Sequence, residues 1–105
     1  MHSEGKLVRD RIPQIIRDSG AKPVVYTAGP EEYRRRLRAK LSEEVAEFLG
    51  AEAAKAPEEL ADVLEVVREL AADLGVAAEQ LEKIREAKAA ERGGFGGRVV
   101  WMGNR

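Results

Sequence analysis

The sequence has 105 residues, which is the size of one domain, and its 18 basic residues nearly balance 19 acidic ones. The net charge of -1 excludes a global attraction to nucleic acid or to anionic membranes, so we expect neither as a partner. The absence of cysteine excludes disulfides and thiolate metal sites. The start lacks the apolar stretch of a signal peptide, and no apolar run has membrane-spanning length, which indicates a cytoplasmic protein.

The first part of the chain predicts one short helix and one extended segment. Ile12, Ile15 and Ile16 recur at helical spacing, and Pro13 fits only in a first turn, so we expect a helix that begins near Ile12. Gly20 is placed to close that helix in a left-handed cap. The β-branched run near 22–28 favours a short extended segment.

Two long helices are expected next. Pro30 and Pro57 are each followed by two glutamates, which is the pattern of a helix start. Gly50 marks the weak spot after the first helix, and Gly75 ends the second. The apolar arc of the second helix is too wide for one neighbouring helix to cover, which predicts a partner subunit.

The last part of the chain predicts one more helix and a short strand. The helix spans roughly 78–92 and ends at two glycines, and a second extended segment follows near 97–102, whose natural partner would be 22–28. The fold class is therefore all-α: an antiparallel helical bundle that forms a single domain over 1–105 and is completed by oligomerisation.

Four carboxylates stand where the long helices would bury apolar surface. At about 100° per residue, Glu44 falls about 20° from Leu37, in the middle of the apolar stripe, and Glu47 lies on its edge. Glu59 and Asp62 border the apolar side of the next helix. Helices joined by a short connection pack antiparallel, so the two pairs would face each other in an oxygen-rich cage. Such a cage needs a cation, and hard oxygen ligands suit Mg²⁺, with Mn²⁺ as a substitute.

A plain structural interpretation competes with the cage. In it, Glu44 pairs with Lys40 one turn earlier, and the other carboxylates belong to solvated helix faces. We favour the cage because a glutamate on an apolar stripe and a matching acidic pair on the next helix are independent coincidences.

Cations on the last helix form a second cluster. Lys88, Arg92 and Arg85 all fall within about 40° of the direction of Leu81, on the apolar side. In a structural role, their positive charges would interact with the negative carboxyl end of the helix dipole while their stems pass along the core. In a functional role, they would bind the phosphate oxygens of a substrate.

The motifs together resemble a known enzyme family. Residues 43–47 and 59–62, eleven residues apart, match the EExxE...ExxD pattern of the MazG-like, all-α nucleoside triphosphate pyrophosphohydrolases. KLVRDRIP at 6–13 and KAAERGGF at 88–95 resemble signatures of the small stand-alone house-cleaning branch, which is predicted to act on non-standard nucleotides. The late motif lacks the asparagine and extra aromatic residue of MazG itself, so base recognition cannot be transferred.

The resemblance implies Mg²⁺-dependent hydrolysis between the α- and β-phosphates of a nucleoside triphosphate, which gives a nucleoside monophosphate and pyrophosphate. It also implies a homodimer or homotetramer. The metal ligands it implies are Glu44, Glu47, Glu59 and Asp62. The phosphate contacts it implies are Lys88 and Arg92.

Further roles follow as hypotheses. Glu43 or Glu47 would orient or deprotonate the attacking water, and Arg85 would help stabilise the pyrophosphate leaving group. Contacts to the nucleotide are expected from Lys6, Arg9 and Arg11. Arg9 has a structural alternative, an ion pair that anchors the N-terminal segment.

The rival function belongs to another class. The protein would be a non-catalytic helical dimer that acts as a regulatory or assembly module. Its carboxylates would then meet arginines across the subunit interface, which the balanced charge permits.

Overall fold

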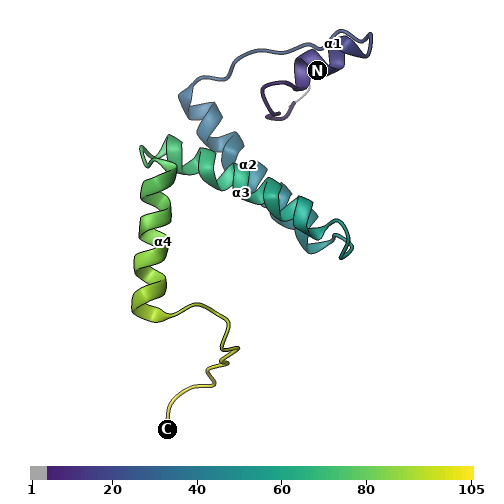
Figure 1. Ribbon diagram of the computed structural model, residues 1–105. Helices are drawn as coiled ribbons and strands as arrows, with labels where there is room; N and C mark the ends of the chain where they lie inside the picture. Colours follow the sequence, from purple (N-terminus) through teal and green to yellow (C-terminus); the bar gives the residue numbers. More distant parts are fainter. Residues whose placement is uncertain (1–4) are drawn as a thin grey trace.

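The computed structural model describes residues 5–105, and four helices make up its regular structure (Figure 1). They are α1 (Ile12–Asp18), α2 (Pro30–Leu49), α3 (Ala56–Asp73) and α4 (Ala78–Arg92). The predicted all-α class is confirmed, and every expected helix begins and ends close to its expected position. No helix within the described range is both long and apolar enough to cross a membrane.

Local sequence explains where the helices begin and end. A proline occupies the first turn of α1, α2 and α3, where its fixed φ suits the helix and its missing N–H group would have no partner anyway. Gly20 and Gly75 follow α1 and α3 with φ values of +97° and +81°. Glycine adopts this left-handed conformation without a steric penalty, so the chain can turn sharply after each helix.

The helices α2 and α3 lie side by side in opposite directions (Figure 1). Tyr33, near the start of α2, donates a hydrogen bond to Glu69 near the end of α3. Glu44, near the end of α2, instead lies beside Asp62 near the start of α3. The short connection between the two helices therefore produces the antiparallel pair that the sequence predicts.

The core is small and lies between these two helices. Leu37 on α2, which is 3% exposed, and Val66 and Ala71 on α3 are the buried apolar residues within residues 5–105. Leu60 and Leu64 on α3 are more than half exposed. The radius of gyration is 18.2 Å, whereas a compact chain of this length has about 13 Å. The single chain thus leaves apolar helix surface uncovered.

The last helix stands apart from the α2–α3 pair. Figure 1 shows α4 leaving the end of α3 and running away from both longer helices. Among the helices it contacts only α3, and it buries no residue. Ile84, on its apolar side, is 56% exposed. Leu81, on the same side, is half-buried. The described part of the chain therefore covers the apolar side of α4 only in part.

The expected strands do not form. Residues 22–28 and 97–102 have no regular secondary structure, and Val24 and Val99 are 101% and 90% exposed. A β-strand is stable only when a neighbouring strand accepts and donates its backbone hydrogen bonds. Figure 1 shows these two segments at opposite ends of the molecule, so the prediction that they pair is wrong for the single chain.

Candidate metal centre

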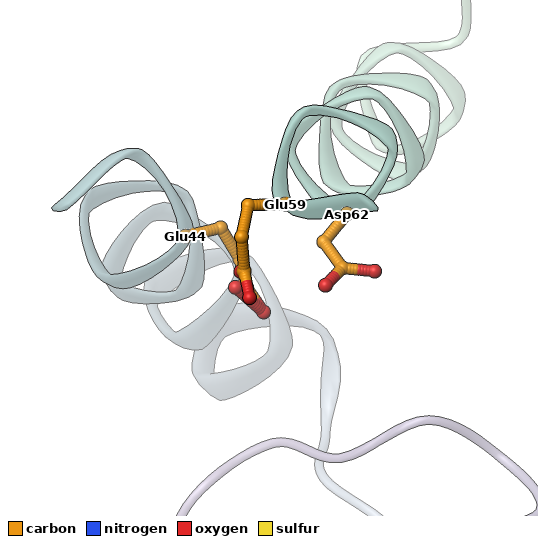
Figure 2. A group of neighbouring side chains, drawn as sticks. All are labelled: Glu44, Glu59 and Asp62. Carbon is orange, nitrogen blue, oxygen red and sulfur yellow. The ribbon is translucent and has the colours of Figure 1, made fainter. Parts of the chain in front are cut away.

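Three carboxylates from two helices converge at the α2–α3 contact. Glu44 on α2 and Glu59 and Asp62 on α3 are all half-buried, and each offers an oxygen that lies within 4.8 Å of the others. Figure 2 shows Glu44 and Glu59 meeting between the helices, with Asp62 beside them. The spacing of three residues places Glu59 and Asp62 on one face of α3, and the antiparallel packing brings Glu44 to that face. We call these three residues the acidic triad.

The surroundings of Glu44 disfavour its charged form. Its side chain is 13% exposed. Burial raises the pKa of Glu44, and the neighbouring carboxyl of Glu47 raises it further through a hydrogen bond and through charge repulsion. Lys40 acts in the opposite direction, and Asp62 adds to the repulsion. A cation among these oxygens would remove the penalty on the charged form of Glu44.

Two side-chain cations already contact the cluster. The Arg9 Nη2 atom lies 2.8 Å from Asp62 Oδ1. The Lys40 Nζ atom lies 3.9 Å from Glu44 Oε1 and 3.3 Å from Glu43 Oε1. The lysine contact is the one that the plain structural interpretation predicts. Because Lys40 is shared between two glutamates, the cluster keeps an excess of negative charge.

A cavity of about 400 Å³ opens beside the triad, between α2, α3 and the N-terminal segment. The residues that line it include Leu37 and Val66, which are buried, and two members of the triad, Glu44 and Asp62. The cations at this cavity are Arg9, Arg11 and Lys40. The volume suits a small molecule, and the mixture of carboxylates and cations suits one with charged groups.

The acidic residues named from the sequence separate into two groups. Glu44, Glu59 and Asp62 come together as expected, whereas Glu47 is exposed and is not among the three converging oxygens. The Glu47 carboxyl is nevertheless close enough to Glu44 to raise the pKa of Glu44. Glu43 turns to Lys40 on its own helix.

The basic residues of α4 do not reach the triad in the single chain. Lys88, Arg92 and Arg85 are all exposed, and none of them lines the cavity beside the triad. Arg85 pairs with Glu82 at 2.6 Å, and Arg92 pairs with Glu91 at 3.4 Å. Their phosphate-binding role stays a prediction.

The N-terminal cations lie closer to the site. Arg9 and Arg11 line the cavity beside the triad, and Lys6 lines a second cavity of about 540 Å³ between the N-terminal segment, residues 24–28 and the start of α2. Several residues that line the cavity beside the triad were not among the site residues expected from the sequence; they include Tyr33, Glu65 and Glu69, which have polar side chains on the two long helices. The signal for Tyr33 was its place at the start of the apolar stripe of α2, which turns its ring toward α3.

Comparison with known proteins adds a relative without a known function. The chain is 55% identical over 47 residues to a protein of Mycolicibacterium smegmatis that is described as uncharacterized. The aligned region is 45% of this chain and 48% of that protein, so the chain spans about half the length of this curated relative. No protein-family model and no solved structure matches the chain. A function must therefore be argued from the site itself.

The raised pKa of Glu44 predicts how stability depends on pH. The folded protein holds the proton on Glu44 more tightly than the unfolded chain does, so this residue makes the free energy of unfolding fall as pH rises from the ordinary glutamate pKa through the raised one. With chelator present, Glu44→Gln should have a higher free energy of unfolding than the wild type. This difference should grow as pH rises through that window and then level off. Urea unfolding between about pH 4 and pH 8 measures it. A difference that shrinks with pH would contradict the raised pKa.

Proposed function

We propose that the protein hydrolyses a nucleoside triphosphate, of a non-canonical kind, to a nucleoside monophosphate and pyrophosphate, with Mg²⁺ held by the acidic triad. The observation that carries this proposal is the convergence of three carboxylate oxygens within 4.8 Å at the edge of a cavity that also holds arginines. An all-oxygen donor set suits Mg²⁺, which shares its coordination shell readily with phosphates. The motif resemblance supplies the substrate class and the bond that is cleaved.

Each side chain near the triad has a role in this proposal. When bound, Mg²⁺ neutralises charge on phosphoryl oxygens and makes a nearby water more acidic. Glu47 is exposed beside Glu44 and is better placed than Glu43 to accept the proton of the attacking water, because Glu43 is occupied by Lys40. Arg9 and Arg11 hold the phosphates from the N-terminal side of the cavity.

Assembly is part of the same proposal. The exposed leucines on α3 and the partly uncovered apolar side of α4 support a homodimer or homotetramer, since a second copy would bury them. Because α4 runs away from the triad of its own chain, Lys88, Arg92 and Arg85 contribute to phosphate binding only if α4 packs against another subunit.

A non-catalytic regulatory or assembly module is the second candidate. The contact that favours it is the ion pair between Arg9 and Asp62, which neutralises one carboxylate of the triad without a metal. The module hypothesis expects arginines from a partner subunit, whereas this arginine comes from the same chain.

One experiment separates the two functions. The protein is mixed with a panel of canonical and non-canonical nucleoside triphosphates, including dUTP and dCTP, in Mg²⁺ or in excess chelator. We expect pyrophosphate from at least one nucleotide, only with Mg²⁺ present. Release of orthophosphate instead would contradict cleavage between the α- and β-phosphates. No release from any nucleotide, together with no thermal shift on adding Mg²⁺, would decide for the module.

A further inference from the structure

We infer that Arg9 is a displaceable counter-ion, which neutralises Asp62 when no metal is bound and moves to the phosphates of the substrate when Mg²⁺ enters the triad. This inference rests on the proposed function, because it concerns how cations are exchanged at the same site.

The guanidinium group of Arg9 lies beside the acidic triad. Arg9 Nη2 lies 2.8 Å from Asp62 Oδ1, across 53 residues of sequence. The oxygens of Asp62 also belong to the acidic triad, so the arginine stands next to the place where a cation would be held. Arg9 lines both cavities, and it therefore has open space beside it as well as the carboxylate.

The N-terminal segment has few buried contacts, although the Arg36 guanidinium group donates a hydrogen bond of 3.3 Å to the backbone oxygen of Gly5. The helix α1 contacts none of the other three helices and buries no residue. Residues 5–9 form no regular secondary structure, and only Leu7 and Val8 among them are half-buried. The Arg9 and Asp62 side chains are 59% and 34% exposed, and ion pairs of that exposure contribute little stability. Releasing Arg9 therefore disrupts no packed core.

Arg9 and the metal ion carry charges of the same sign. A guanidinium group and Mg²⁺ repel each other, so Arg9 beside Asp62 opposes binding of the metal alone. A triphosphate reverses this effect. The guanidinium group can then bind phosphate oxygens in a bidentate way, and Arg9 and the metal no longer compete for Asp62. The same residue should thus weaken binding of Mg²⁺ alone and strengthen binding of a triphosphate with Mg²⁺.

Titration calorimetry tests this reversal of sign. We expect Arg9→Gln to bind Mg²⁺ alone about two- to fivefold more tightly than the wild type, which is the range that an exposed ion pair allows. The same variant should bind inorganic triphosphate more weakly at saturating Mg²⁺. Arg17→Gln is the matched control, since it removes the same charge from the exposed surface of α1 and lines neither cavity. It should match the wild type in both titrations.

A structural measurement provides a readout that does not depend on activity. The chain has no cysteine, so Ala21→Cys and Ala72→Cys place two spin labels at exposed positions before α2 and on α3. Pulsed electron resonance then reports the distances between them. We expect Mg²⁺ to shift the distance distribution of the otherwise unaltered chain, and Arg9→Gln to show the shifted distribution without Mg²⁺.

The possible failures are distinguishable. If Arg9→Gln binds Mg²⁺ no more tightly than the wild type, Arg9 is a structural anchor and the exchange is wrong, while magnesium-dependent pyrophosphate release can still stand. If the wild type does not bind Mg²⁺ at all, the metal centre and the exchange are both wrong. Circular dichroism of each variant shows whether its helices are intact.

Discussion

The Glu44→Gln variant is expected to lose magnesium-dependent pyrophosphate release by about 100-fold or more, the scale seen when a group that stabilises transition-state charge is removed. The same change should stabilise the metal-free protein, because it removes a largely enclosed carboxylate whose charged form is disfavoured by burial and by Glu47. Initial rates with saturating Mg²⁺ measure the first effect, and thermal unfolding in chelator measures the second. A loss of activity together with a gain in metal-free stability would identify Glu44 as a metal ligand whose charge does not stabilise the fold.

The control for this variant is Glu31→Gln. Glu31 is also a glutamate of α2, but it is exposed in the first turn, far along the helix from the triad. It should leave pyrophosphate release and the response to Mg²⁺ unchanged. A Glu44→Gln protein that keeps its activity would contradict the metal centre. One that loses both activity and stability would assign Glu44 a structural role in the ion pair with Lys40.

The helices could be predicted because their signals are local. A proline followed by glutamates and a glycine at the end are read within one turn of helix, and α2 and α3 follow these signals closely. The position of Glu44 was also predictable, because helical periodicity fixes which residues share a face with Leu37. Together with a short connection, this was enough to bring Glu44, Glu59 and Asp62 together.

Contacts between distant segments could not be predicted in the same way. Periodicity places Glu47 on the edge of the apolar stripe, and only the packing of α3 decides that this edge stays exposed. Periodicity also places Lys88 on the apolar side of α4, but it does not show which surface covers that side. The partner of Arg9 lies 53 residues away, and no local pattern selects Asp62 among the acidic residues. The β-branched residues of 22–28 indicated an extended conformation but could not supply a neighbouring strand.

The second large effect is expected from Leu37→Ala, which should lower the free energy of unfolding by about 2–5 kcal/mol. Leu37 is 3% exposed, and it is one of few buried side chains between α2 and α3. A domain of this size has a total stability of about 5–15 kcal/mol, so the loss would be a large fraction of it. Urea unfolding measures the change. Leu49→Ala is the matched control on the same helix, because Leu49 is 75% exposed and its loss should change stability by about 0.5 kcal/mol or less.

This variant also tests whether the core positions the metal centre. Leu37 lines the cavity beside the triad, and it precedes Glu44 by about two turns on the same face of α2. A void at Leu37 would loosen the contact between α2 and α3, and the oxygen of Glu44 would lie less firmly beside those of Glu59 and Asp62. Mg²⁺ should therefore bind more weakly to the folded Leu37→Ala protein than to the wild type or to Leu49→Ala. Unchanged Mg²⁺ affinity despite the lost stability would mean that contacts near the triad, and not this core, hold the carboxylates together.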